Sequence, residues 1–213
     1  DRATPPPGEA PSASPKTAAS SSAHGELSHL VKVTQDLLVG MLEDANQYRS
    51  GVLALRLDSV LLPMRLDSAV EINDSKAKTA SAQGLFSKYD AAVRARIKAA
   101  RESCASAPYA PSVREDLLRG FDEGMAKTMP QLEMVLSYEA EMYAELTVLL
   151  DFMLTQQGKF HQVGNQLKFD AQADAATYNA SIARYQAIAA KQIALRELLQ
   201  EAVSYTHLTL PTN

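Results

Sequence analysis

Apolar side chains recur every three or four residues along four stretches of the chain, and this spacing is typical of amphipathic helices. The stretches cover residues 27–55, 63–107, 113–153 and 171–199. The third is the most regular, because its steps of four and three continue over about five heptads. Short connections make successive long helices antiparallel neighbours. The pattern therefore predicts a mainly α fold, an antiparallel four-helix bundle with long helices.

Several residues predict where these helices begin and bend. Ser112 and Glu115 have the spacing of a capping box, and Asp170 is expected to cap the fourth helix. Pro130 lies inside the third helix and should kink it. The second helix should begin at Pro63 and bury a stripe of mostly small residues, namely Leu66, Val70, Ala77, Ala80, Tyr89, Val93, Ile97, Ala100 and Cys104.

A β-hairpin is predicted in residues 159–169, between the third and fourth helices. Gly164-Asn165 is a two-residue turn signal with alternating residues on both sides. Pairing across this turn places Phe160 opposite Phe169 and Gln162 opposite Leu167. A lone hairpin is marginally stable in water, so we expect its apolar face to dock on the helices.

Residues 1–25 are rich in Pro, Ser and Ala and carry almost no large apolar side chain. Such a segment cannot bury enough surface to offset the cost of ordering, so we predict a disordered leader. It resembles the tether that follows the lipidated cysteine of bacterial lipoproteins. An ordinary ragged terminus is equally consistent with this composition, and a cysteine directly before Asp1 would decide for the tether.

Residues 203–213 differ in composition from the helix before them. Val203 to Thr212, VSYTHLTLPT, resembles the one-frame translation of a transposase adapter used in DNA sequencing libraries. We interpret this segment as an adapter-derived scar, which leaves residues 26–202 as the helical bundle domain. A genuine tail rich in Thr and Leu is the alternative.

Charge gives a test of how the second and third helices align. A turn near residues 107–111 would pair residues whose numbers add up to about 218. Lys76 and Lys78 then lie opposite Glu141 and Glu139, and a buried cross-helix ion pair is predicted there. Glu139 also occupies a core step of its helix, which makes it a candidate acid or base, but pairing with a lysine is the favoured interpretation.

Arg94, Lys98 and Arg101 share one face of the second helix and form a candidate patch for anionic lipid headgroups or phosphate. A solvated face that complements nearby acids is the favoured interpretation.

The remaining composition argues against several classes of function. The net charge of −4 gives no basic footprint for nucleic acid. Cys104 is the only cysteine, and we expect it to be buried in the core. His29 and His161 have no companion at metal-ligand spacing. No phosphate loop, dinucleotide fingerprint or triad motif is present. We therefore predict no catalytic, cofactor-binding or metal-binding residues.

One stretch, residues 149–179, resembles a pattern of uncharacterised proteobacterial envelope lipoproteins. The resemblance is carried by Leu150-Asp151-Phe152, Gly158, Phe160, Gly164, Leu167, Phe169 and Tyr178-Asn179. It implies a lipid-anchored periplasmic protein, and it carries over no catalytic residues.

The leading hypothesis is a non-enzymatic, membrane-tethered periplasmic helical-bundle protein with a structural or protein-interaction role. A protein partner and self-association are both open, and contact with a membrane is expected only through a lipid anchor. The alternative is a sensor or small-ligand-binding module, which five or more converging polar side chains around an interior cavity would favour over a dry, closed core. A weaker third hypothesis is an enzyme that uses Glu139 or Tyr143 in a cleft.

Overall fold

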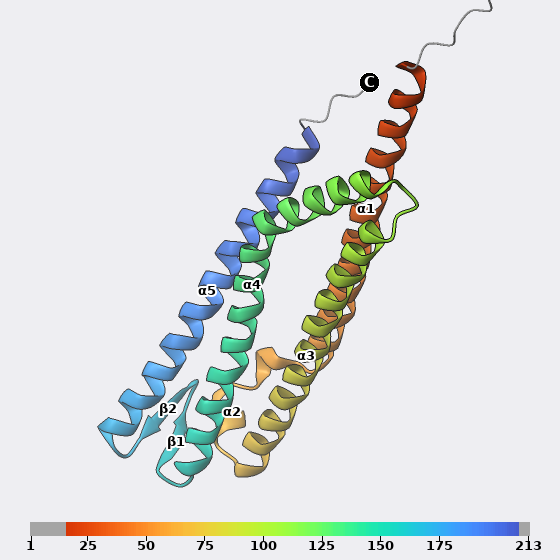
Figure 1. Cartoon of the computed structure of the whole chain (residues 1–213). Helices are drawn as coiled ribbons and strands as arrows, with labels where there is room; N and C mark the ends of the chain where they lie inside the picture. Colours follow the sequence, from red (N-terminus) through yellow and green to blue (C-terminus); the bar gives the residue numbers. More distant parts are fainter. Residues whose placement is uncertain (1–15, 209–213) are drawn as a thin grey trace, which may run out of the picture.

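The computed structural model describes residues 16–208, which form five α-helices, one short 3-10 helix and one β-hairpin. Figure 1 shows the long helices arranged as an elongated rod with the hairpin at one end. The elements are, in chain order, α1 (Lys16–Ala54), η1 (Leu57–Ser59), α2 (Pro63–Leu66), α3 (Ala69–Ala105), α4 (Pro111–Thr155), β1 (Phe160–Val163), β2 (Gln166–Phe169) and α5 (Gln172–Leu208).

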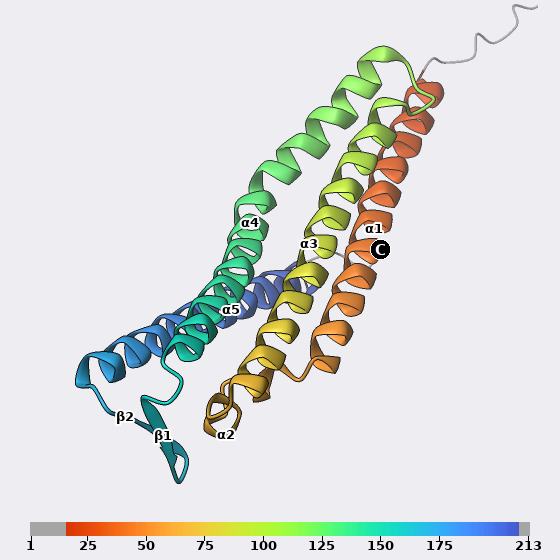
Figure 2. The same cartoon turned by 90° about the horizontal axis from the view of Figure 1, so that it is seen from below.

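The long helices pack in the order α1, α3, α4 and α5. Figures 1 and 2 both show α1 and α3 side by side. Helix α1 makes few contacts with α4, and within residues 16–208 it shares no packed interface with α5. The sequence prediction is therefore confirmed as a mainly helical chain of long helices with one hairpin. Closure of four helices around a single core is not observed in this part of the chain.

The predicted leader and the predicted second helix both need correction. Helix α1 begins at Lys16, so residues 16–25 are helical, and the rest of the predicted leader lies outside the described residues. The second helix is divided into α2 and α3, because Ser68 has an extended backbone before α3 begins. This extra helix is the reason that the hairpin lies between α4 and α5 rather than between a third and a fourth helix.

Helix α5 continues to Leu208 and so enters the segment interpreted as an adapter scar, whose last residues lie outside the described part of the chain. That interpretation stays a prediction.

The buried face of α3 differs from the predicted stripe in its first half. Val70 is 78% exposed, and Ala77 and Ala80 are exposed as well. The buried side chains are instead Ile72, Ser75, Thr79 and Ala82. The Thr79 hydroxyl donates to the Ser75 carbonyl oxygen at 2.9 Å, so burial leaves that group hydrogen-bonded. Further along α3, the predicted residues Val93, Ala100 and Cys104 are buried.

Neither predicted side-chain cap is formed. The residue before α4 is Ala110, and no side chain caps that end, because Pro111 takes the first helical position and moves Ser112 inside the helix. Helix α5 begins at Gln172, which leaves Asp170 one residue too early to act as its cap.

Helix α4 contains Pro130 and is bent, as the sequence predicts. The bend is visible in the green part of α4 in Figure 1, and the N-terminal part of the helix runs at an angle to α3. Pro130 has no N–H to donate to the preceding turn, and its ring crowds that turn.

The hairpin has the predicted register, with Phe160 opposite Phe169 and Gln162 opposite Leu167. Its apolar face docks on the helices as expected. The ring centroids of Phe160 and Phe169 are 5.3 Å apart, and those of Phe169 and Tyr178 of α5 are 5.4 Å apart.

The buried apolar residues form two separate clusters. The hairpin-end core comprises Val60, Leu66, Ile72, Leu146, Leu149, Leu150, Met153 and Phe160. The turn-end core comprises Val33, Leu37, Ala100, Cys104, Ala107, Leu117 and Phe121. The candidate site begins at the turn-end core, whose Leu37 and Phe121 line it, and extends into the middle of the rod.

Candidate functional site

A groove of about 840 Å³ runs between α1, α3 and α4. Most of its surface is apolar. The large apolar side chains that line it from α1 and α4 are Leu30, Leu37, Leu38, Met41, Val52, Leu53, Phe121, Met125, Leu132, Val135 and Leu136. This volume lies in the range of small-molecule binding sites.

The groove exists because α1 and α4 both pack on α3 but make few contacts with each other. Gly120 and Gly124 of α4 widen the groove, because neither residue places a side chain in it. A Cβ at Gly120 would lie 3.7 Å from Leu30 Cδ2, and a Cβ at Gly124 would meet no atom within 4 Å. The α1 side is held against α3 by an ion pair in which Arg96 Nη2 lies 3.0 Å from Asp44 Oδ1, and the Arg96 guanidinium holds the pKa of Asp44 below its usual value.

A buried polar cluster closes one end of the groove. Glu139 of α4 is 9% exposed. Its Oε1 accepts hydrogen bonds from the hydroxyls of Tyr48 and Tyr143, the latter at 3.1 Å, and its Oε2 accepts one from Gln192 Nε2. The two tyrosine hydroxyl oxygens are 2.5 Å apart. The cluster therefore joins α1, α4 and α5 through one carboxylate.

Aromatic rings of α3 support this cluster. The ring of Tyr48 stacks on that of Tyr89, with centroids 5.1 Å apart, and meets Phe86 edge-on at 6.1 Å. Tyr48, Tyr89 and Phe86 all line the groove. Burial raises the pKa of Tyr48 and of Tyr143 well above the ordinary tyrosine value, and the neighbouring Glu139 raises both further.

These tyrosines should make the protein sensitive to alkaline pH. Burial also raises the pKa of Tyr178 and Tyr185, so the folded chain holds four phenolic protons more tightly than the unfolded chain does. An unfolded tyrosine has a pKa of about 10, so this stabilisation is complete below that pH and is lost as the pH rises above it. In an alkaline titration, tyrosinate absorbance from Tyr48 and Tyr143, whose pKa values are raised most, should appear only together with loss of helical circular dichroism. Ionisation of all eight tyrosines in a still-helical protein would contradict this expectation.

The predicted cross-helix ion pair is wrong in its partners. Lys76 pairs with Asp151, ten residues beyond Glu141, and Lys78 pairs with Asp74 of its own helix at 2.8 Å. Glu141 is exposed and accepts a hydrogen bond from Ser137. The N-terminal part of α4 runs at an angle to α3. More residues of α4 are therefore needed to cover a given length of α3, and this shifts which residues of the two helices lie opposite each other. Glu139 is buried as predicted, but its hydrogen bonds are made with tyrosine and glutamine.

The predicted basic patch is largely neutralised by carboxylates. Arg94 Nη1 lies 2.8 Å from Glu133 Oε1, and Arg101 Nε lies 2.9 Å from Asp122 Oδ1. These arginines hold the pKa of Glu133 and of Asp122 below their usual values. Lys98 is exposed and 3.8 Å from Glu102. The arrangement favours the interpretation that this face complements the acids of α4.

Other sites considered in the sequence offer little chemistry. Among the described residues, no three histidine, cysteine or acidic side chains gather as a metal site. Over the same residues, no helix combines the length and the apolar character needed to cross a membrane. Cys104 is fully buried, and burial raises the pKa of its thiol, as expected for a core residue. His161 is exposed on the hairpin opposite Lys168.

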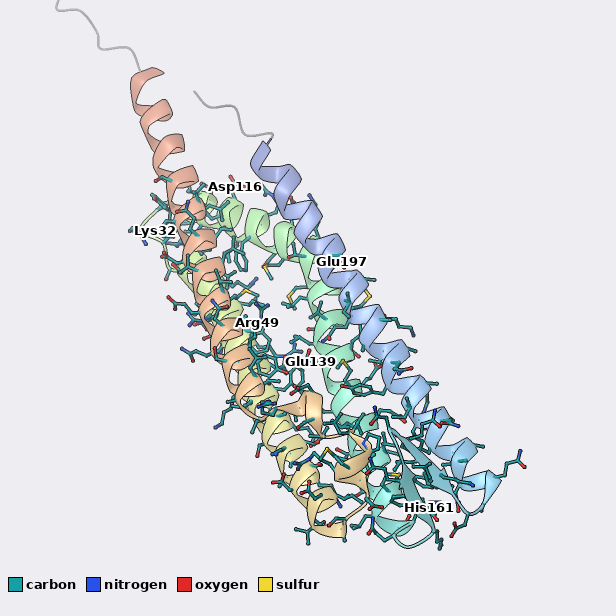
Figure 3. All side chains as sticks on the ribbon, turned by 180° about the vertical axis from the view of Figure 1, so that it is seen from behind. Lys32, Arg49, Asp116, Glu139, His161 and Glu197 are labelled. Carbon is teal, nitrogen blue, oxygen red and sulfur yellow. The ribbon has the colours of Figure 1, made fainter. Side chains whose placement is uncertain are left out.

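The sequence did not single out Arg49, which also lines the groove. Figure 3 places it on α1 and Glu139 on α4, in the middle part of the rod. Among the arginines whose side chains the structure describes, Arg49 is the one with no hydrogen bond or ion pair to the protein. Its own helix supplies no acid, because Ala45 and Leu53 occupy the positions four residues before and after it.

A scan against protein-family models and searches of curated proteins and of solved structures found no match to this chain. The resemblance of residues 149–179 to envelope lipoproteins stays a prediction.

Proposed function

We propose that this chain is a non-enzymatic binding protein whose groove between α1, α3 and α4 holds an elongated, largely apolar small molecule. The observation that carries the proposal is the groove itself, because an apolar cavity of about 840 Å³ with a few polar groups is the usual form of a ligand site. Seven lining residues carry polar side chains: Thr34, Tyr48, Arg49, Tyr89, Thr128, Gln131 and Glu139.

The open packing of the long helices supports the same proposal. In a closed four-helix bundle, side chains from all four helices would fill the interior. Here the space between α1 and α4 is lined by apolar side chains on both walls, and we propose that a ligand completes the core at this place. A catalytic role for Glu139 fits less well, because both of its carboxylate oxygens already accept hydrogen bonds from protein groups.

Filling the groove should abolish binding without harming the fold. Gly124→Leu adds a side chain into space where a Cβ meets no atom within 4 Å, and it replaces a helical glycine, which should stabilise α4 by up to about 1 kcal/mol. The measurement is the fluorescence of N-phenylnaphthylamine, a neutral apolar probe, titrated with the full chain. The unsubstituted protein should bind the probe saturably, and Gly124→Leu should weaken binding at least about tenfold, because the apolar pocket is then occupied.

Gly84→Leu is the matched control. Gly84 lies in α3, a Cβ there also meets no atom within 4 Å, and it does not line the groove. This variant should gain the same helical stability and bind the probe as the unsubstituted protein does. No saturable binding to the unsubstituted protein, or equal binding by both variants, would refute the ligand-binding proposal.

A protein partner is the second candidate, because apolar side chains continue outward from the groove along α1. Val31, Leu38, Val39 and Leu42 are between 47% and 62% exposed. An amphipathic helix of a partner protein could cover this face together with the groove. The periplasmic location and the lipid anchor stay predictions under either candidate.

A further inference from the structure

This inference rests on the proposed ligand-binding groove and concerns the chemistry of its ligand. The groove is lined by two charged residues, Arg49 and Glu139. They differ in what they still offer to a ligand. Glu139 is nearly buried, and three protein donors already occupy its oxygens. Arg49 is exposed, and within the described part of the chain its guanidinium donors have no acceptor.

The other arginines show that an unpaired guanidinium is exceptional here. Arg94, Arg96 and Arg101 each form a cross-helix pair with a carboxylate. A guanidinium carries five N–H donors in a planar fork that matches a carboxylate or a phosphate. At the edge of an apolar groove, it can pair with an anionic headgroup while leaving the apolar part of the ligand inside.

The direction of the groove from Arg49 fits such a ligand. Arg49 and Tyr48 lie toward one end of the α1 wall, and the lining continues along α1 to Leu30. With a rise of 1.5 Å per residue, this wall extends for about 28 Å beyond Arg49. Along that length the α1 wall is formed mainly by leucine and methionine side chains, which suit an alkyl chain.

We infer that the groove binds a single-chain anionic amphiphile, with its acidic headgroup on Arg49 and its alkyl chain along α1 toward Leu30. The headgroup is held at the groove rim by the Arg49 guanidinium. The chain is held by burial against the leucines of α1 and by the apolar side chains of α4.

The test is displacement of N-phenylnaphthylamine from the full chain by three probes with the same alkyl chain: laurate, dodecanol and dodecylamine. Laurate should bind more tightly than dodecanol or dodecylamine by about threefold to tenfold, the range for a charge-assisted pair at a partly exposed site. Arg49→Ala should remove this preference, and Arg49→Glu should reverse it in favour of dodecylamine. Dodecanol affinity should stay within about twofold in Arg49→Ala, because an exposed substitution leaves the apolar walls intact.

Arg119→Ala is the control for general charge. Arg119 is exposed, pairs with Asp116 on α4 and does not line the groove, so this variant should keep the laurate preference. Equal displacement by all three probes would overturn the anionic headgroup while leaving the groove as a ligand site. Tighter binding of dodecylamine to the unsubstituted protein would move the headgroup to Glu139 and also overturn the inference. Absence of probe binding would instead refute the proposed function.

Discussion

Leu149→Ala is expected to lower the free energy of unfolding by about 2–5 kcal/mol, the range for truncating a buried leucine. Leu149 is fully buried in the hairpin-end core, where it packs among Leu66, Ile72 and Met153. Alanine would leave a cavity that helices α2, α3 and α4 can fill only by moving together. The measurement is urea unfolding followed by circular dichroism at the helical band.

Val148→Ala, at the adjacent position of the same helix, is the control. Val148 is 54% exposed, so truncating it removes little packing and should change the free energy of unfolding by less than about 0.5 kcal/mol. Equal losses in the two variants would show that the burial assigned to α4 is wrong.

Glu139→Ala is the second substitution with a large expected effect, a loss of about 2–4 kcal/mol. It removes the acceptor of three hydrogen bonds, and a buried donor left without an acceptor costs about 1–3 kcal/mol. Two of the three donors are cut off from water, because Tyr143 is 4% exposed and Gln192 is 5% exposed, whereas Tyr48 is half-buried. Because the donors come from α1, α4 and α5, the loss should reach all three helices.

Glu141→Ala tests whether removing any acidic residue from this part of α4 lowers the free energy of unfolding as much as Glu139→Ala does. Glu141 is exposed and accepts one hydrogen bond from Ser137, so its removal should cost less than about 0.5 kcal/mol. Urea unfolding of both variants gives the comparison. A Glu139→Ala protein as stable as Glu141→Ala would contradict a central role for the buried cluster.

Two parts of the fold that depend on local sequence were predicted correctly, the hairpin register and part of the buried face of α4, whereas the two helix caps and the unbroken second helix were not. The Gly164-Asn165 turn fixes the hairpin register because a two-residue connection leaves little freedom in pairing. The stripe of α4 was predicted correctly at its two ends, where large apolar residues such as Leu117, Leu149 and Met153 are buried, whereas its middle part lines the groove.

The errors in helix packing have a common physical origin, because they depend on how distant elements meet. The first half of α3 buries Ser75 and Thr79, whose hydroxyls can bond within the helix, so polarity alone misidentified its face. The pairing of α3 with α4 was misjudged because Pro130 shows that α4 bends but not in which direction. Lys76 therefore meets Asp151 instead of Glu141.

The candidate site was predicted only in part. The core position of Glu139 indicated burial, which the structure confirms, but its partners come from three places far apart in the sequence. The groove itself was missed, because periodicity shows which face of a helix is apolar and not whether another helix covers it. Gly120 and Gly124 lie four residues apart on the same face of α4, and this pair was a sequence signal for open space beside that face.

The separation of the two cores has a consequence for how the protein unfolds. The hairpin-end core joins α2, α3 and α4 with the hairpin, whereas the turn-end core joins α1 with the ends of α3 and α4 that meet at their connection. Each can protect its own backbone amides from solvent, and the long helices connect them through a middle region that contains the polar cluster and the aromatic rings around it. Hydrogen exchange would then proceed in two cooperative units with different opening free energies, and a molecule bound between α1 and α4 would slow the opening of the unit that contains α1.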